Sequence, residues 1–307
     1  MMYDVVILGG GPAGVAAGVY AARKKLKTLL ITQEVGGQSL VSDNIQNWVG
    51  TQSISGIQLA KNLEEHLRAQ KRVTIKMPEK TLAVKEVGEG LLVTTNKDEY
   101  QTKTIIVCLG ARRRKLDVPG EKKFDGKGVA YCSTCDAPLF SGKAVVVVGG
   151  GNAGLEAVQD LLPYVAQIYL LTHGEALRGD TVTIEAIHRS KKLKQIIFNA
   201  EILEIIGEQF VTAFKYRDKK TSQEKIIDVQ GVFVEIGAVP NSEIVKDLVD
   251  LNERAEIVID HKTGATSHPG IFAAGDVTDE KYKQNNISAG DGVKTALSAY
   301  NYLLKRK

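Results

Sequence analysis

The stretch YDVVILGGGPAGVAAGVYAARKKLKTLLIT, residues 3–32, predicts a strand, a glycine turn, a helix and a second strand in that order. Residues 4–8 form a short apolar run, which is typical of a strand buried on both faces. The alanines and valines after the glycines are small enough for a helix to pack closely on a sheet, and residues 28–32 form the second apolar run. This succession indicates a nucleotide-binding unit with a parallel sheet.

The glycines of this turn have the spacing of a dinucleotide-binding motif. Gly9 allows the tight turn, Gly11 lets the backbone approach a pyrophosphate, and Gly14 lets the helix lie close to the strand. Glu34, 20 residues after Gly14, is placed to accept a hydrogen bond from a ribose hydroxyl. The spacing alone often marks only a flexible turn, but here the strand, the helix, the second strand and the acid are all present.

The same pattern returns 140 residues later. An apolar run at 144–148 is followed by GGGNAG at 149–154, a helical segment and a second apolar run at 167–172. Glu175 then follows 21 residues after the third glycine of the motif. A single repeat at this distance predicts a pair of similar domains rather than a solenoid, and two such units suggest two nucleotides.

Composition and length exclude several classes of protein. The 307 residues suffice for two ordinary domains, and 43% hydrophobic with 25% charged residues is typical of a soluble globular protein. The net charge of +4 is modest, and the basic run at 188–194 is interpreted as a solvated helix face rather than a nucleic-acid site. The apolar N-terminus lacks a basic leader region and contains five glycines, and no long apolar run suggests a membrane span. We therefore expect a cytoplasmic protein.

Two of the three cysteines form a C-x-x-C motif, Cys132 and Cys135, followed directly by Asp136. A zinc site needs about four ligands, and none of the five histidines lies near the pair in sequence. A structural disulfide across two residues closes a very small loop and would stabilise the fold little. Cys108, within an apolar segment, is expected to be a buried strand residue. A redox-active pair is the favoured interpretation, and no metal is expected.

Together these residues resemble the low-molecular-weight thioredoxin reductases and the closely related flavoprotein subunit of alkyl hydroperoxide reductase. The resemblance covers nearly the whole chain and rests on eight motifs in the family's order. They are GGGPAG (9–14), GGQ (36–38), IQNWVG (45–50), CSTCDAP (132–138), GGGNAG (149–154), VFVEIGAVPN (232–241), GIFAAGDVT (270–278) and YKQNNISAGDG (282–292). The last two are closer to the hydroperoxide-reductase subunit. That subunit also carries N-terminal thioredoxin-like domains, whereas this sequence begins directly at the expected flavin strand.

The resemblance implies an α/β fold with two Rossmann-like three-layer domains, the second inserted into the first. The FAD-binding domain would comprise residues 1–112 and 242–307, and the pyridine-nucleotide domain, which carries the C-x-x-C, residues 113–241. The two crossings, 110–121 and 235–243, contain Gly and Pro, as linkers do.

Further elements are expected in each domain. A small antiparallel meander is expected within residues 73–95 of the first domain and 200–218 of the second. Residues 271–274 are expected to form a strand, and residues 283–304 a long helix.

The resemblance also implies the residues that contact FAD. They are Gly9, Gly11, Pro12, Ala13, Gly14, Glu34, Gly37, Gln38, Asn47, Gly110, Ala111, Gly275, Asp276, Lys283, Gln284 and Asn285. Asp276 would bond the ribityl chain, although an acid there could also cap the following helix. The start of that helix would stabilise the anionic reduced flavin. Lys283 stands where the family usually has Arg, so the positive charge is kept but the planar guanidinium group, with its paired hydrogen-bond donors, is lost.

The residues implied for the pyridine nucleotide are Gly149, Gly151, Asn152, Ala153, Gly154, Glu175, Arg178 and Gly237. The family's NADPH signature is H-R-R-x-x-x-R, whereas this chain has THGEALR at 172–178. Two of the three arginines that would bind a 2′-phosphate are missing, and Glu175 suits a free 2′-hydroxyl. NADH is therefore expected over NADPH. If Glu175 is only an exposed loop acid, the site is weak for both nucleotides and another electron donor becomes possible.

The function implied is an FAD-dependent thioredoxin-disulfide reductase that passes electrons from NAD(P)H through FAD to the cysteine pair. Cys135 would face the flavin, Cys132 would attack the partner's disulfide, and Asp136 would move protons. The family's usual Asp-Gly is Asp136-Ala137 here, which puts the local turn in question.

The partners implied are a thioredoxin or glutaredoxin-like protein and a second copy of this chain in a homodimer, with no nucleic acid and no membrane. Three alternatives remain open: the reductase component of a peroxiredoxin system, a reductase that uses a non-pyridine donor, and a flavin-binding redox sensor with a vestigial pyridine site.

Overall fold

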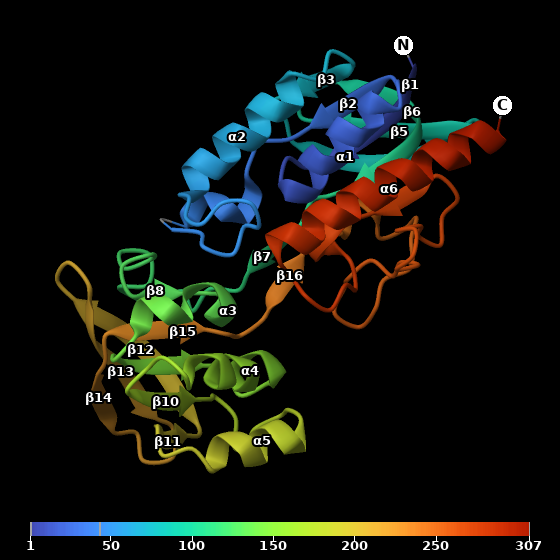
Figure 1. Cartoon of the computed structure of the whole chain (residues 1–307). Helices are drawn as coiled ribbons and strands as arrows, with labels where there is room; N and C mark the ends of the chain where they lie inside the picture. Colours follow the sequence, from blue (N-terminus) through green and yellow to red (C-terminus); the bar gives the residue numbers. More distant parts are fainter. Residues whose placement is uncertain (1, 43, 307) are drawn as a thin grey trace. The chain divides into compact units, whose positions relative to one another are not determined.

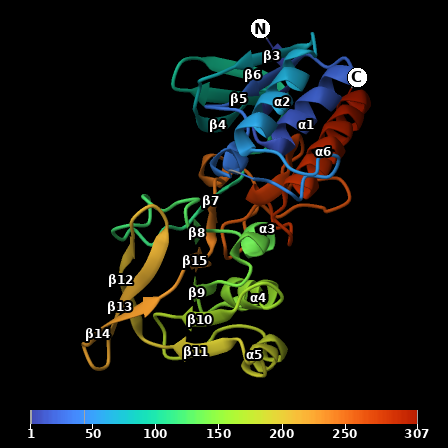
Figure 2. The ribbon, with the colours of Figure 1, turned by 60° about the vertical axis from the view of Figure 1, so that its left-hand side comes forward.

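A computed structural model describes residues 2–42 and 44–306, which separate into two compact units (Figure 1). One unit comprises Met1–Arg112 and Val239–Lys307, and the other comprises Arg113–Ala238. Each unit is built on a parallel sheet with helices on one face and antiparallel strands over the other, as Figure 2 shows from a second side. The expected α/β fold with two Rossmann-like units is confirmed.

The first unit has a parallel core of five strands. β1 (Met2–Leu8) lies between β2 (Thr28–Ile31) and β6 (Glu99–Val107), with β3 (Val73–Lys76) beyond β2 and β17 (Ile271–Ala273) beyond β6. The unit is discontinuous in sequence because its last parallel strand comes from the C-terminal part of the chain.

The antiparallel strands of this unit continue the main sheet. β4 (Thr81–Val87) pairs with β5 (Gly90–Thr95), and β5 pairs with residues 99–102 of β6. Residues 105–107 of the same strand pair with β17, because nine residues of strand, about 30 Å, are long enough for two partners on one edge. The expectation of a meander over 73–95 is therefore corrected: residues 73–76 form the parallel strand β3.

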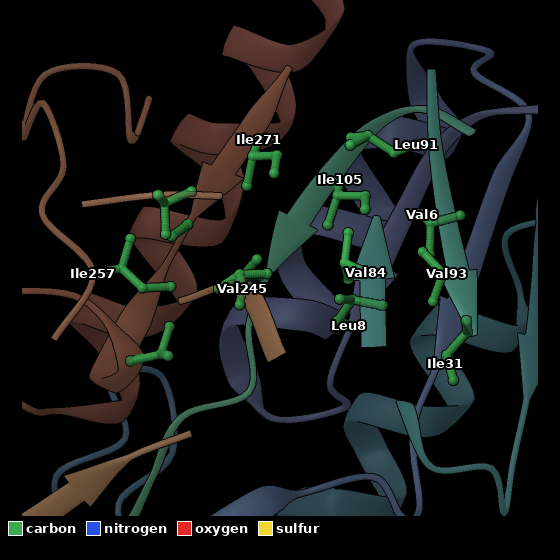
Figure 3. Packing of buried hydrophobic residues seen from close by; sticks show 14 of the residues in the cluster. Val6, Leu8, Ile31, Val84, Leu91, Val93, Ile105, Val245, Ile257 and Ile271 are labelled. Atoms are coloured by element: carbon green, nitrogen blue, oxygen red, sulfur yellow. The ribbon is translucent and has the colours of Figure 1, made fainter. Parts of the chain in front are cut away.

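Apolar residues fill both faces of this sheet because side chains alternate along a strand. Val5 and Ile7 of β1 face the helices α1 (Pro12–Arg23), α2 (Gly56–Arg68) and α6 (Asn285–Lys305). On the opposite face, shown in Figure 3, β1 packs against the antiparallel strands and the segment before β17. The residues labelled there are Val6, Leu8, Ile31, Val84, Leu91, Val93, Ile105, Val245, Ile257 and Ile271.

The second unit repeats this plan. Its parallel sheet has the order β11 (Leu193–Ile197), β10 (Gln167–Leu171), β9 (Ala144–Val148), β15 (Gly231–Val234) and β8 (Val129–Ala130). The strands expected at 144–148 and 167–172 are thus β9 and β10, the second one residue shorter.

Helices and a separate antiparallel sheet cover the two faces of this second sheet. α3 (Ser133–Asp136), α4 (Asn152–Leu161) and α5 (Thr181–His188) lie on one face. The antiparallel sheet on the other comprises β12 (Ala200–Gly207), β13 (Val211–Asp218) and β14 (Glu224–Asp228). The meander expected within residues 200–218 is present as β12 and β13. A third strand, β14, lies beyond that stretch.

The two crossings between the units pair with each other as β7 (Ala111–Arg113) and β16 (Ala238–Pro240). Four short 3₁₀ helices complete the described elements: η1 (Gly37–Val41), η2 (Ala137–Phe140), η3 (Glu243–Val245) and η4 (Gly275–Val277).

Helices α1 and α6 approach each other closely because glycine lies at their contact. A Cβ atom added at Gly292 of α6 would lie 2.1 Å from the carbonyl oxygen of Ala13. Gly290 lies on another side of the same helix, where an added Cβ would have no heavy atom within 4 Å.

We predict that Gly292→Ala lowers the free energy of unfolding of the first unit by about 2 kcal/mol or more, because a backbone oxygen cannot move aside as a side chain can. Gly290→Ala is the matched control and should leave stability unchanged or raise it by up to ~1 kcal/mol, since Ala favours helix over Gly. Chemical denaturation of the wild type and of both variants measures the two changes. Equal stabilities would contradict the close contact.

Candidate functional site

The first glycine turn leaves the N-terminus of α1 open above the end of β1. Gly9 has φ +108°, and a Cβ added there would lie 2.3 Å from the carbonyl oxygen of Cys108. A Cβ added at Gly14 would lie 1.9 Å from the carbonyl oxygen of Gly9, so neither position accepts a side chain. At Gly11 no atom lies within 4 Å of an added Cβ, and this open space is where a pyrophosphate would approach the helix N-terminus.

The turn after β2 lies against this first turn. The N–H of Gly36 donates to the carbonyl oxygen of Gly10 at 2.9 Å, and a Cβ added at Gly37 would lie 3.3 Å from the Cα of Gly11. Glu34, three residues beyond the end of β2, is exposed. The structure therefore brings Glu34 and Gly37 beside the glycine turn, as a nucleotide with its ribose at Glu34 would require.

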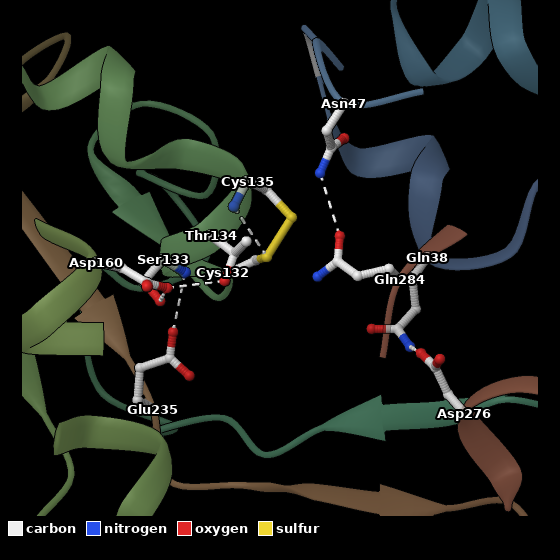
Figure 4. The surroundings of a disulfide bond; sticks show 10 residues. All are labelled: Gln38, Asn47, Cys132, Ser133, Thr134, Cys135, Asp160, Glu235, Asp276 and Gln284. Carbon is white, nitrogen blue, oxygen red and sulfur yellow. Dashed lines mark hydrogen bonds between the residues drawn. A yellow bond between two sulfur atoms is a disulfide. The ribbon is translucent and has the colours of Figure 1, made fainter. Parts of the chain in front are cut away.

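Residues far apart in sequence meet between η1, the following loop and the start of α6. Gln38 Nε2 donates to Asp276 Oδ2 at 3.2 Å, and Ser288 Oγ donates to Asp276 Oδ1 at 3.3 Å. Asn47 Nδ2 donates to Gln284 Oε1 at 3.2 Å. Figure 4 shows the first and third of these bonds. Four residues predicted for FAD, Gln38, Asn47, Asp276 and Gln284, thus form two hydrogen-bonded pairs.

Asn286 also belongs to this group, although the sequence interpretation did not select it. Its Nδ2 donates to the carbonyl oxygen of Asn47 at 2.7 Å, and its Oδ1 accepts the N–H of Val49 at 3.3 Å. Asn285, which was selected, is the first residue of α6. The signal was available, because both residues lie in the motif YKQNNISAGDG.

Lys283 holds the turn at η4. Its ammonium group lies 3.1 Å from Glu256 Oε1, both side chains are largely buried, and it donates to the carbonyl oxygen of Thr278. Its charge is therefore balanced within this unit, and the carboxylate of Glu256 was not expected from sequence. Any contact between Lys283 and a flavin remains a prediction.

The first crossing places Gly110 and Ala111 at the start of β7. Gly110 has φ +64°, and its carbonyl oxygen accepts the N–H of Asn241 at 3.0 Å. Ala111 is buried. In the second crossing, Gly237 has φ +92° with open space at its Cβ position, and its carbonyl oxygen accepts the N–H of Arg114 at 3.0 Å.

The second glycine turn repeats the first in the other unit. Gly149 has φ +145°, and an added Cβ would lie 2.2 Å from the carbonyl oxygen of Glu235. A Cβ added at Gly154 would lie 1.9 Å from the carbonyl oxygen of Gly149. Gly151 precedes α4 as its N-cap, and Asn152 and Ala153 are exposed at the start of that helix.

The segment after β10 is fixed to this turn through its backbone. The N–H of Arg178 donates to the carbonyl oxygen of Gly150 at 2.7 Å, which leaves the Arg178 side chain exposed. Glu175 is also exposed, and Lys220 Nζ lies 3.9 Å from its carboxylate. The structure therefore places Arg178 at the glycine turn, and it leaves the side chains of Arg178 and Glu175, the two residues selected for the ribose end, exposed.

The cysteine pair begins a short helix in the second unit (Figure 4). Cys132 and Cys135 form a disulfide with Cα atoms 5.3 Å apart, and the N–H of Cys135 points to Cys132 Sγ at 3.2 Å. Ser133 Oγ and Thr134 Oγ1 both donate to Asp160 Oδ2 at 2.8 Å, so α4 holds the helix that carries the cysteines. The expected C-x-x-C geometry is thus present at the start of α3.

Two carboxyl groups beside this helix have raised pKa values. Burial raises the pKa of Asp136 to about 6, opposed by Arg113. Burial also raises the pKa of Glu235 to about 7, opposed by Arg113 and by the N–H of Ser133, which Glu235 Oε1 accepts at 3.2 Å. Both groups therefore change charge close to neutral pH, where a group that exchanges protons is most effective.

Glu235 and Asp160 were not selected from sequence. Glu235 lies within the motif VFVEIGAVPN, where an acid directly follows an apolar strand, and that break in the pattern was the available signal. Asp160 lies near the end of α4, and nothing in its spacing relates it to the cysteines.

Cys108 lies one residue beyond the end of β6 rather than within the strand as expected, because the chain turns there against Gly9. The thiol is buried, and burial raises its pKa far above the ordinary value. Among residues 2–42 and 44–306, no group of three or more His, Cys, Asp or Glu could hold a metal ion. No helix in the described part of the chain is both long and apolar enough to cross a membrane.

Comparisons with known proteins fit this geometry. The family described as pyridine nucleotide-disulphide oxidoreductase matches residues 3–294. A Bacillus subtilis protein named NADH dehydrogenase is 42% identical over 304 residues, and a subunit of the alkyl hydroperoxide reductase of Staphylococcus epidermidis is 40% identical over 304 residues. Both alignments cover 99% of this chain, which spans about 59% of the length of each relative. The solved thioredoxin reductase of Streptococcus pyogenes is 32% identical with a TM-score of 0.92, over 99% of both chains.

We predict that Asp136→Asn changes how stability depends on pH. The folded protein keeps the proton on Asp136 up to a pKa of about 6, whereas the unfolded chain loses it near 3.8. The stability that this neutral carboxyl contributes is present below the unfolded value and is lost as pH rises through the folded value. From pH 4 to pH 7.5 the variant should therefore gain about 2 kcal/mol in unfolding free energy relative to wild type. Denaturation at both pH values measures this, and a constant difference would contradict it.

Proposed function

The chain belongs to the pyridine nucleotide-disulphide oxidoreductase family, and from this premise we propose that it reduces a disulfide on a thioredoxin- or glutaredoxin-like protein. Electrons pass from a pyridine nucleotide through FAD to Cys132 and Cys135. The observation that carries the proposal is that the cysteine pair lies in the unit with the second glycine turn, beside two carboxyl groups with raised pKa values.

The first unit fits FAD. Gly11 leaves room for the pyrophosphate at the start of α1, Glu34 is exposed for the ribose, and the pair Gln38–Asp276 offers hydrogen-bonding groups for the ribityl chain. A bound flavin accepts a hydride from a nicotinamide and passes two electrons to a disulfide. The second unit repeats the open turn at Gly151 and would hold the pyridine nucleotide.

The reduced cysteine pair supplies the two electrons that the substrate disulfide accepts. Cys132 attacks one substrate sulfur, and the other leaves as a thiolate that takes a proton from Asp136. Cys135 then gives its proton to the ionised Asp136 and attacks the sulfur of Cys132, which restores the Cys132–Cys135 disulfide and releases the second substrate sulfur as a thiolate. A pKa of about 6 suits Asp136 to give and regain a proton near neutral pH.

A peroxiredoxin-system reductase is the second candidate. It is supported by the relatives that are named as a subunit of alkyl hydroperoxide reductase; this chain spans 59% of the length of the one from S. epidermidis. In that role the chain would reduce a thioredoxin-like carrier that serves a peroxidase. A homodimer and a cytoplasmic location belong to the same proposal and rest on the family resemblance.

Anaerobic titration of the purified protein with NADH and with NADPH tests the proposal. Bleaching of the flavin by either nucleotide, followed by reduction of added thioredoxin, supports it. Bleaching by neither would exclude a pyridine-nucleotide reductase and leave a non-pyridine donor or a redox sensor.

The two cysteines should behave differently when they are replaced singly. In Cys132→Ser, the remaining thiolate of Cys135 should lie beside the oxidised flavin and give a long-wavelength charge-transfer band. Cys135→Ser should lack the band but trap a mixed disulfide with thioredoxin through Cys132. Visible spectra and non-reducing gels measure both results. Opposite spectra would reverse the roles of the two sulfurs.

NADH should be the better electron donor, because Arg178 is the one arginine at the selected ribose end, where a 2′-phosphate would also meet the exposed acid Glu175. The nearby Lys220, whose Nζ lies 3.9 Å from the Glu175 carboxylate, is paired with that acid. Each charge-assisted hydrogen bond contributes about 1.5–3 kcal/mol, so two missing arginines should weaken NADPH by roughly two orders of magnitude. A Cβ at Gly174 would have no contact shorter than 3.6 Å, so the double change His173→Arg with Gly174→Arg has room and should raise kcat/KM for NADPH.

The matched control for the nucleotide preference is Glu175→Ala, which should lower kcat/KM for NADH without creating NADPH use. Stopped-flow flavin reduction measures both nucleotides in each variant. A wild-type kcat/KM for NADPH equal to that for NADH would refute the preference.

A further inference from the structure

Glu235 occupies a position at which the fold does not require a carboxyl group. It directly follows β15, its N–H donates to the carbonyl oxygen of Val148 at 2.8 Å, and its own carbonyl oxygen lies against Gly149. Cys108 has the same position in the first unit: its N–H donates to the carbonyl oxygen of Leu8 at 2.8 Å, and its carbonyl oxygen lies against the first glycine turn. The sheet and the turn therefore form equally well with an uncharged residue.

Burial makes a carboxyl group costly at this position. Glu235 is 9% exposed, and its Oε1 accepts the backbone N–H of Ser133, the residue next to Cys132. The charged groups that face it come from three elements: Asp136 on α3, Asp160 on α4 and Arg113 on β7. Two of these three are acids, and together with burial they outweigh Arg113, so the pKa of Glu235 rises to about 7. The fold does not require a carboxyl group here, and burying one is unfavourable. The presence of Glu235 beside the cysteine helix therefore indicates a role at the cysteines.

Reduction of the disulfide creates charge next to Glu235. Two electrons entering the Cys132–Cys135 bond leave two thiolates, which take up as many protons as their pKa values allow at that pH. The N–H of Cys135 points at Cys132 Sγ and favours a thiolate there. Glu235 accepts the N–H of Ser133, the residue next to Cys132. When its carboxyl group is ionised, the negative charge disfavours the same thiolate by repulsion.

We propose that Glu235 is a positioning residue for the cysteine pair: it holds helix α3 through the N–H of Ser133, and its ionisation suppresses thiolate formation in the reduced pair. When Glu235 carries its proton, the thiolate forms readily. When Glu235 has lost it, the proton stays on sulfur. Glu235 thereby raises the pH at which the reduced pair forms its reactive thiolate. The proposal rests on the proposed function only in taking the pair to cycle between disulfide and dithiol.

The test is the alkylation rate of the reduced protein. Wild type and Glu235→Gln are reduced with dithiothreitol, desalted anaerobically and treated with iodoacetamide from pH 5 to 10. Mass spectrometry of the peptide with Cys132 and Cys135 separates these thiols from Cys108. Glutamine keeps an acceptor for the N–H of Ser133 but cannot ionise, so it removes the charge and leaves the hydrogen bond.

The expected result is a ratio of rates, variant over wild type, that changes with pH. It should be near one at pH 5, where Glu235 is neutral, and rise to roughly three- to tenfold between pH 7 and 8.5, because a nearby like charge shifts a thiol pKa by about one unit. It should fall back toward one at pH 10, where both thiols are ionised. A helix that was merely loosened would change the rate at every pH.

Asp160→Asn is the matched control. It removes a carboxyl group from the same helix, but Asp160 is partly exposed and binds hydroxyl groups rather than the backbone N–H beside Cys132, so its ratio should stay within about twofold. Glu235→Ala is the second variant and should fold, because the small residue Cys108 occupies the equivalent place in the first unit. Because it also removes the hydrogen bond to Ser133, its ratio should show the same rise with pH on top of a change that does not depend on pH.

A ratio near one at all pH values in both Glu235 variants overturns the proposal, as does an equal rise in Asp160→Asn. Neither result depends on a nucleotide. Failure of the proposed function would appear separately, as a flavin that neither NADH nor NADPH reduces.

Discussion

The contact on which each unit depends is that of a carbonyl oxygen against the first glycine of the turn. In the first unit the oxygen of Cys108 occupies the space of a Gly9 side chain, and in the second the oxygen of Glu235 occupies that of Gly149. This contact brings the neighbouring strand end against the turn, so that the helix starts directly above the sheet with its N–H groups open to an anion. It also fixes where the side chain after that strand must lie, and in the second unit that side chain reaches the cysteine helix.

The first unit is completed by contacts that no local sequence pattern describes. The residues of η1 and its loop bond to residues of η4 and α6 that lie more than 230 positions away. Lys283 and Glu256 hold the backbone between η4 and α6 from within the unit. The groups predicted to contact the flavin are thus aligned by a network of side chains rather than by one element.

The cysteine helix is held by carboxyl groups on two sides. Asp160 binds the hydroxyls of Ser133 and Thr134, and Glu235 binds the N–H of Ser133. These bonds position the sulfurs. Burial raises the pKa values of Asp136 and Glu235, and the carboxyl groups of Asp160 and Asp136 add to the rise at Glu235. In Glu235 one side chain therefore combines a hydrogen bond to the cysteine helix with a titratable charge beside it.

The sequence by itself determined the two strand–turn–helix units, their duplication and the C-x-x-C motif, because glycine spacing, apolar runs and paired cysteines act over short stretches of chain. It also placed Glu34, Asp276 and Glu175 near the ends of the correct strands. Only the tertiary structure decided that β3 joins the parallel sheet, that β6 has two partners on one edge, and that Glu256 balances Lys283. The same holds for Glu235, whose raised pKa comes from burial and from acids on α3 and α4. Burial and the meeting of distant side chains are properties of the folded chain, and no spacing along the sequence encodes them.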